Sequence, residues 1–253
     1  MKFTAALFAA ATAAPAQLII GGKNAVDGQF PWQVTLKRAT GSHFCGGSIL
    51  KNDVVMCAAH CKQSSNTFTA GAGSASLNGQ RQVLNIRQQI PHPSYDSQRI
   101  DWDYMVIKTA TNFSFDDYVK PIALVAPLTA ELPNKTPCRT SGYGYSQYIN
   151  GNPGIIASTL QWTDTECITN AVCRQTWLFQ TLTSRQQCAD YAGVTSCMGD
   201  SGGPLTYVQD GQEVLLGNVS WGHSKCSTNG YPAAYSRNAD PTANQWIRTN
   251  AGL

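Results

Sequence analysis

Short runs of β-branched and other apolar residues, separated by turns, constrain the fold of this chain more than any other feature. The clearest runs span residues 33–36, 48–50, 54–56, 104–107 and 214–219. The turns between them are rich in glycine, proline and asparagine, as in residues 71–73 and 150–154. Strand-length runs bounded by turn-forming residues predict an all-β protein. Only residues 241–251, which begin with proline and precede Gly252, predict a helix.

The composition narrows the class of protein further. Of the 253 residues 42% are hydrophobic, which is enough for a packed core and excludes a disordered chain. Charged residues make up only 13%, against about 25% in an average globular protein. The net charge of +3 is spread along the chain without a basic block, so we expect no nucleic-acid partner.

Nine cysteines and the first residues of the chain indicate export. Residues 1–16 have a charged start, an apolar stretch and a small-residue cleavage site at Ala14-Pro15-Ala16, which is typical of a signal peptide. The apolar stretch is shorter than the roughly 20 residues that a membrane anchor needs. We therefore expect a secreted, extracellular protein without a membrane partner. Its odd number of cysteines predicts a disulfide framework with at least one free thiol.

Three sequons become possible glycosylation sites if the chain is secreted. They begin at Asn112, Asn134 and Asn218. The third lies in an apolar, strand-like run, so we expect it to be unused.

Three short stretches contain the residues of nucleophilic catalysis. Ser201 lies in Gly-Asp-Ser-Gly-Gly-Pro, where glycines leave its hydroxyl accessible and let backbone N–H groups turn towards a bound carbonyl. His60 lies in Ala-Ala-His-Cys, and Asp101 and Asp103 precede the run at 104–107. A serine hydroxyl is a poor nucleophile at neutral pH. It needs a histidine that accepts its proton and a carboxylate that orients the imidazole.

The order of His60, the aspartates and Ser201, with Ile-Ile-Gly-Gly at residues 19–22, resembles the chymotrypsin/trypsin family of serine endopeptidases. The resemblance runs from Ile19 to about Trp246. It implies two packed six-stranded antiparallel β-barrels, at about 19–125 and 126–240, and a C-terminal helix at about 241–251. The proline-rich stretch 121–137 is then the linker between the barrels.

The resemblance also implies the role of each residue. His60 would be the general base, Ser201 the nucleophile and Asp103 the orienting carboxylate, with Asp101 as a solvated alternative. The N–H groups of Gly199 and Ser201 would form the oxyanion hole. The hydroxyl of Ser220 would support the carboxylate.

The substrate pocket implied by the resemblance lacks one residue of trypsin-like members. They carry an aspartate six residues before the nucleophile, where this chain has Thr195, so a buried substrate cation would be unpaired. Asp190 would compensate only if it reached the pocket. We expect a chymotrypsin-like preference for large apolar residues, with an elastase-like preference for smaller ones as the alternative. The residues assigned to the pocket are Thr195, Ser196, Met198, Ser220, Trp221, Gly222 and Ala233.

Activation in this family frees a new amino terminus, which pairs with the aspartate before the nucleophile. Here those residues would be Ile19 and Asp200. Cleavage of the signal peptide after Ala16 leaves residues 17–18 as the whole pro-segment. Leu18 stands where relatives have Arg or Lys, so trypsin should not activate the chain.

The family pattern pairs six of the cysteines as Cys45–Cys61, Cys173–Cys188 and Cys197–Cys226. The usual partner of Cys138 is replaced by Tyr207, and Cys167 is expected on a neighbouring strand. We therefore predict a fourth bridge, Cys138–Cys167, with its Cα atoms under about 7 Å apart. Cys57 is expected to be a buried free thiol.

We expect no cofactor and no metal, because residues 62–95 contain no Asp or Glu that would form the calcium site of some relatives. His43, His92 and His223 are expected at the surface, with the border of the substrate cleft as the alternative place for His223. The partners would be protein or peptide substrates and proteinaceous inhibitors, and the protein a monomer with a digestive role. A protease-like binding protein without catalysis is the alternative from another class.

Overall fold

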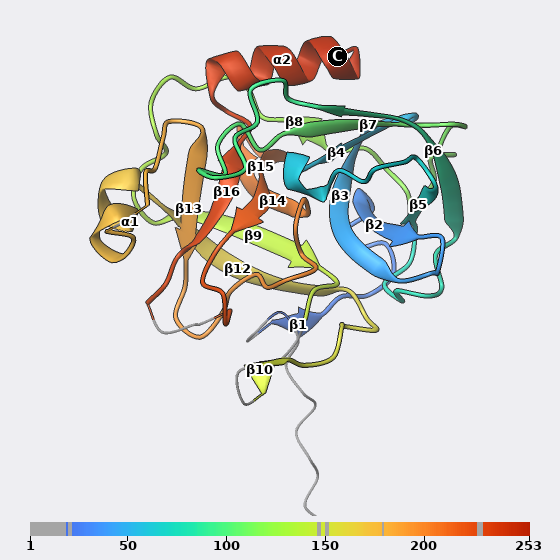
Figure 1. Ribbon diagram of the computed structural model, residues 1–253, viewed down its shortest axis with the longest axis horizontal. Coiled ribbons are helices and arrows are strands. Elements are labelled where there is room, and N and C mark those ends of the chain that lie inside the picture. The colour runs from blue at the N-terminus through green and yellow to red at the C-terminus, as the bar shows by residue number, and fades with distance from the viewer. Residues whose placement is uncertain (1–18, 20–21, 146–147, 150–151, 179, 227–229) are drawn as a thin grey trace, which may run out of the picture.

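The computed structural model describes residue 19 and residues 22–145, 148–149, 152–178, 180–226 and 230–253 (Figure 1). The expected signal peptide and pro-segment, residues 1–18, lie outside this part. Two barrels of strands lie side by side, and the C-terminal helix runs along one edge of both (Figure 1). No helix in the described part is long and apolar enough to cross a membrane.

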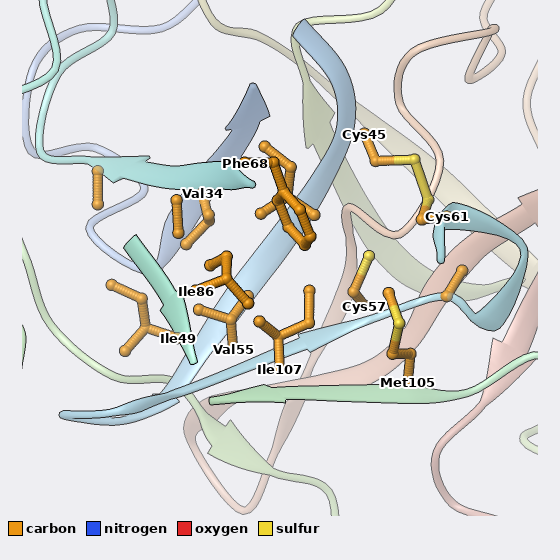
Figure 2. Packing of buried hydrophobic residues seen from close by; sticks show 14 of the residues in the cluster. Val34, Cys45, Ile49, Val55, Cys57, Cys61, Phe68, Ile86, Met105 and Ile107 are labelled. Carbon is orange, nitrogen blue, oxygen red and sulfur yellow. A yellow bond between two sulfur atoms is a disulfide. The ribbon is translucent and has the colours of Figure 1, made fainter. Parts of the chain in front are cut away.

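The N-terminal barrel has six antiparallel strands and is closed. Its inward residues alternate along the strands because side chains of a strand point to opposite faces. Val34, Ile49, Val55 and Ile107 fill the interior (Figure 2), together with Leu36, and all five are fully buried. In the order of pairing, the strands are β2 (Gln33–Arg38), β3 (His43–Lys51), β4 (Val54–Cys57), β7 (Met105–Thr109), β6 (Gln82–Pro91) and β5 (Phe68–Ala72).

The C-terminal barrel closes in the same way, because its first strand pairs with both the second and the last. In the order of pairing, its strands are β9 (Thr136–Gly142), β12 (Gln161–Ile168), β13 (Gln186–Asp190), β16 (Ala233–Arg237), β15 (Gln212–Trp221) and β14 (Pro204–Gln209). The predicted fold class of two six-stranded antiparallel barrels with a C-terminal helix is therefore confirmed.

Two short strands from the N-terminal half join this second sheet. β1 (Lys23–Asn24) pairs with β12, and β8 (Ala123–Leu124) pairs in parallel with β15. The chain thus crosses between the barrels at its start and again at the linker. A further hairpin consists of β10 (Tyr148–Ile149) and β11 (Asn152–Pro153).

The expected helix is α2 (Pro241–Ala251). Asp240 caps its start by accepting hydrogen bonds from the N–H groups of Thr242 and Ala243, and Gly252 ends it in the left-handed conformation. Its apolar face packs on residues of both barrels, among them Val106 and Leu215. The helix therefore holds the barrels against each other.

The expectation that only the tail is helical was wrong. α1 (Asn170–Thr176) is a seven-residue helix, and η1 (Ala59–Cys61) is one turn of 3₁₀-helix. Thr169 caps the start of α1, because its hydroxyl accepts a hydrogen bond from the Val172 N–H. A helix of two turns is too short to show an apolar period in the sequence.

Four disulfides join Cys45 to Cys61, Cys138 to Cys167, Cys173 to Cys188 and Cys197 to Cys226. These are the four pairs expected from the sequence. Cys138 and Cys167 lie on the paired strands β9 and β12, with their Cα atoms 5.9 Å apart. Tyr207, which replaces the usual partner of Cys138, is buried in the same cluster. Cys57 is free and fully buried.

The three sequons differ in accessibility. Asn112 and Asn134 are exposed, whereas Asn218 is fully buried in β15. A glycan on Asn218 would not fit the fold. The exposed positions are the ones open to modification.

The bridge between Cys138 and Cys167 generates the first prediction. Replacing both residues with serine should lower the free energy of unfolding by about 3–4 kcal/mol, because the bridge closes a 29-residue segment in the unfolded chain. Denaturant unfolding without reductant measures the change, with Cys57→Ser as the matched control that removes a thiol but no bridge. Equal midpoints for the double variant and the original chain would contradict this prediction.

Candidate active site

His60, Asp103 and Ser201 come together where the two barrels meet. His60 lies in η1, after β4, and Asp103 lies two residues before β7, so both belong to the N-terminal barrel. Ser201 precedes β14 in the C-terminal barrel. The Ser201 carbonyl accepts a hydrogen bond from the Gly46 N–H at 2.8 Å, which fixes the turn that carries Ser201 against the N-terminal barrel.

The imidazole of His60 is bound to the carboxylate of Asp103. Nδ1 of His60 lies 2.7 Å from Oδ2 of Asp103, and the backbone N–H of His60 donates to Oδ1 at 2.8 Å. A carboxylate only accepts, so Nδ1 carries the proton and Nε2 has a free lone pair. Burial lowers the pKa of His60, but the charge and the hydrogen bond of Asp103 outweigh it, so the pKa is raised above 6.5.

Asp103 is almost completely buried, and hydroxyls of the C-terminal barrel hold it in place. Ser220 Oγ donates to its Oδ2 at 2.5 Å, and Ser236 Oγ donates to its backbone carbonyl at 2.8 Å. The carboxylate therefore receives hydrogen bonds from both barrels. Such donors stabilise a buried negative charge that would otherwise be costly.

The turn around Ser201 leaves two backbone donors free. No acceptor in the described part of the chain receives the N–H of Gly199 or of Ser201. Gly199 has a φ of 92°, a conformation that disfavours any residue with a side chain. These two N–H groups could therefore bind an oxygen of a ligand. Among the hydrogen bonds of the described residues none joins Ser201 Oγ to His60 Nε2, a contact that often tightens only when substrate binds.

Cys57 belongs to the buried cluster inside the N-terminal barrel (Figure 2) and packs against this turn at Gly202. Its thiol donates to the carbonyl of Gly46 at 3.2 Å. A Cβ atom at Gly202 would lie 2.4 Å from the sulfur, so only glycine fits between Cys57 and the turn. Burial raises the pKa of the thiol far above its usual value, and the group stays neutral.

His43 and His92 are buried, so the expectation that they lie at the surface was wrong. His43 Nδ1 lies 2.7 Å from Thr35 Oγ1, and its Nε2 lies 2.8 Å from the carbonyl of Gly199. Burial lowers the pKa of His43 to about 4, so the ring is neutral and donates to Gly199. Sequence reasoning missed this support of the Gly199 turn, because the two residues are 156 positions apart.

Asp200 is fully buried next to Ser201. Its carboxylate accepts from the N–H groups of Gly144 and Cys197, at 2.7 and 2.8 Å. Burial raises its pKa to about 6, because these two hydrogen bonds offset desolvation only in part. Ile19 is also fully buried, and no hydrogen bond joins it to Asp200 among the residues described.

A pocket of about 200 Å³ opens beside Ser201. No charged side chain lines it within the described residues. Thr195 and Ala233, which the sequence assigned to the pocket, are not among the residues that line it in the described part of the chain. The backbone of Ala233 lies behind the wall, 3.8 Å from where a Cβ atom of Gly222 would be. The described lining consists of Ser196, Cys197, Met198, Ser201, Val219, Ser220, Trp221, Gly222, His223, Ser224 and Cys226.

The two other aspartates of the sequence analysis are placed elsewhere. Asp101 is buried and ion-paired with Arg185, so the description of it as solvated was wrong. Asp190 lies opposite Glu166 in the pairing of β12 with β13 and is not among the described pocket residues. Burial, and to a lesser degree the charge of Glu166, raise the pKa of Asp190.

One group of potential metal ligands lies at the site, namely Cys45, His60 and Cys61. The two sulfurs form a disulfide with each other and offer no thiolate. His60 alone would not hold a metal ion.

Comparisons with known proteins agree with this geometry. The family model described as Trypsin matches residues 19–247. "Trypsin 5G1" from Aedes aegypti is 32% identical over 240 residues, which cover 93% of this chain and 85% of that protein. "Trypsin delta" from Drosophila erecta is 35% identical over 237 residues, which cover 92% and 88%.

The pairing of His60 with Asp103 generates a prediction about titration. In the original chain the pKa of the His60 imidazole should lie above 6.5. In Asp103→Asn it should lie below 6.5, because burial is then the main remaining influence on this pKa. NMR of the ring C–H protons against pH measures both values. The surface substitution Asp164→Asn serves as control, and an unchanged titration in Asp103→Asn would contradict the assignment.

Proposed function

The chain belongs to the trypsin family of serine endopeptidases, and we propose that it is a secreted enzyme that hydrolyses peptide bonds through His60, Asp103 and Ser201. One observation carries this proposal. The buried Asp103 orients His60 at 2.7 Å, beside a serine turn with two N–H groups that have no acceptor among the described residues. The alternative of a non-catalytic binding protein has no such support, because this chain retains every residue that the chemistry needs.

The proposed reaction follows from these positions. Ser201 Oγ attacks the substrate carbonyl while His60 Nε2 accepts its proton. The oxyanion accepts hydrogen bonds from the N–H groups of Gly199 and Ser201. His60 then donates the proton to the leaving amine, and an acyl-enzyme remains on Ser201. Water, deprotonated by His60, attacks the ester, and the proton returns to Ser201.

The pocket beside Ser201 supports a preference for large apolar residues before the scissile bond. A buried Lys or Arg of the substrate would find no carboxylate among the described lining residues. Met198 and Val219 offer apolar contacts, and Gly222 leaves the wall open. We therefore assign a chymotrypsin-like preference for Leu, Met, Phe and Tyr, although both named relatives are called trypsins.

A peptide library varied at the residue before the scissile bond tests the specificity. We expect kcat/KM for Leu, Met, Phe and Tyr to exceed that for Arg and Lys by at least about a hundredfold, since an unpaired buried charge is costly. A preference for Ala and Val would favour the elastase-like alternative. A preference for Arg would overturn the assignment.

Two variants serve as controls for this experiment. Ser201→Ala should abolish turnover of all peptides, and residual turnover at the original rate would refute the catalytic proposal itself. Ala233 is not among the described lining residues, so Ala233→Gly should leave the relative rates for Trp and Leu unchanged.

For activation, we propose that cleavage after Leu18 frees the amine of Ile19, which then pairs with Asp200. Among the described residues the buried carboxylate of Asp200 has two backbone donors, and its pKa is raised, so a cation beside it would be favourable. The residue before the cleaved bond is Leu18, so the activating enzyme prefers apolar residues or removes dipeptides.

N-terminal sequencing of the active secreted protein tests this route. The sequence should begin at Ile19, and Asp200→Asn, cleaved at the same bond, should lose most activity because its pairing with the amine is lost. Asp117→Asn serves as the control, because Asp117 is exposed, and this variant should retain full activity. An active form that begins elsewhere would refute the route.

The setting follows from the same proposal. Substrates would be proteins and peptides of the extracellular space, and proteinaceous inhibitors would bind the same cleft. We propose a monomer with a digestive role, and neither nucleic acid nor membrane as a partner.

A further inference from the structure

The three residues before Asp103 form a strained turn. Ile100 has a φ of 50° and Trp102 a φ of 56°. β-Branched and aromatic residues rarely adopt this left-handed region, because Cβ crowds the backbone. Such residues persist only where surrounding contacts enforce the conformation. The turn is followed directly by Asp103, whose carboxylate orients His60. The conformation of the turn therefore affects the position of that carboxylate relative to His60.

Asp101, between the two strained residues, makes the contacts that close the turn. Its Oδ1 accepts from Arg185 Nε at 2.9 Å and from Thr183 Oγ1 at 3.1 Å, and its Oδ2 accepts from an Arg185 Nη at 2.5 Å. Oδ1 also accepts from the Trp102 N–H at 2.9 Å, within the turn itself. This is a bidentate ion pair with two further donors, which gives geometric precision as well as attraction.

The donors come from the other barrel. Thr183 and Arg185 precede β13, and the side chain of Gln186 in β13 donates to the Ile100 carbonyl at 3.1 Å. Just beyond Asp103, the hydroxyl of Tyr104 donates to the carbonyl of Arg185 at 3.0 Å. The C-terminal barrel therefore holds the chain on both sides of Asp103.

The ring of Trp102 completes the arrangement. The Arg185 guanidinium lies 4.4 Å from the ring centre, and the His92 ring stacks on Trp102 at 4.3 Å. His92 in turn contacts Trp246 of α2 at 4.7 Å. Arg185 thus binds the turn twice, through the carboxylate of Asp101 and through the ring of Trp102.

We propose that Asp101 is a positioning residue for catalysis, which through Arg185 keeps the strained turn closed and so holds Asp103 in place against His60. The inference rests on the proposed function, because it concerns the rate of the same reaction. Asp101 touches neither substrate nor the reacting atoms. It acts through Asp103, which is two residues away.

Asp101→Asn tests the proposal, because the amide keeps the size of the side chain and removes its charge. We expect kcat per titrated active site to fall about 10- to 100-fold, the range expected for a displacement of about 1 Å in a catalytic group. KM should change less than about threefold, because the pocket beside Ser201 is untouched. The acidic limb of kcat/KM should move to lower pH, because a displaced Asp103 raises the pKa of His60 less.

The chain offers a matched control. Arg139 donates to Asp164 through Nε and Nη2, at 2.9 and 2.7 Å, and its guanidinium lies 4.8 Å from the ring centre of Trp162. This pair has the same residue types, although both donors bind Oδ1 of Asp164, and it is solvent-exposed and lies on β9 and β12, away from Asp103. Asp164→Asn should leave kcat and the pH profile unchanged.

A second variant tests the proposal independently of whether Asp101→Asn folds. Arg185→Lys keeps the positive charge but loses the bidentate geometry, and it should lower kcat and shift the pH profile in the same direction. Original kcat and an unshifted acidic limb in the folded variants would overturn the proposal. Ser201→Ala separates the two proposals. If Ser201→Ala is inactive, unchanged kinetics of the Asp101 and Arg185 variants refute only the role of Asp101. If Ser201→Ala is active, the proposed function itself is refuted.

Discussion

The burial of the Asp103 carboxylate between the two barrels is the constraint on which the site depends. A carboxylate that is only 2% exposed must receive hydrogen bonds, and it receives them from His60 on one barrel and Ser220 on the other. The barrels must therefore meet in one relative position. α2 and the crossing strands β1 and β8 support that position.

Asp200, in the same site, differs from Asp103 in the hydrogen-bond donors that its carboxylate receives. It is as deeply buried as Asp103, yet its donors in the described part of the chain are two backbone N–H groups. The pKa of Asp200 is raised to about 6 by burial, so the charged form is under-stabilised at that place. Gly142 and Gly144 leave no room for side chains around it, because a Cβ atom on either would lie within 2.5 Å of a carboxylate oxygen. No cation pairs with this carboxylate among the described residues, and that missing partner is the physical basis of the proposed activation.

Local patterns in the sequence predicted much of the molecule. The strand runs, the helix at 241–251 and the four cysteine pairs were found because each leaves a signature within a few residues or a family spacing. The burial of Asp101, His43 and His92 was not found. Their partners, such as Arg185 for Asp101 and Gly199 for His43, are 84 and 156 residues away and become visible only when both barrels are folded. Polar residues next to turns look solvated in a sequence unless the distant donor is known.

The ion pair of Asp101 and Arg185 differs from other ion pairs of the chain in its burial. Ion pairs such as Arg81–Asp27 are about 40% exposed, and water reduces them to about 0–1 kcal/mol. The side chains of Arg185 and Asp101 are only 22% and 11% exposed, so each charge depends on the other. A buried pair of this kind contributes little net stability compared with apolar residues of the same size. Asp101 lies between two residues of positive φ and two positions before Asp103, so the pair is better explained by the geometry it enforces than by the stability it adds.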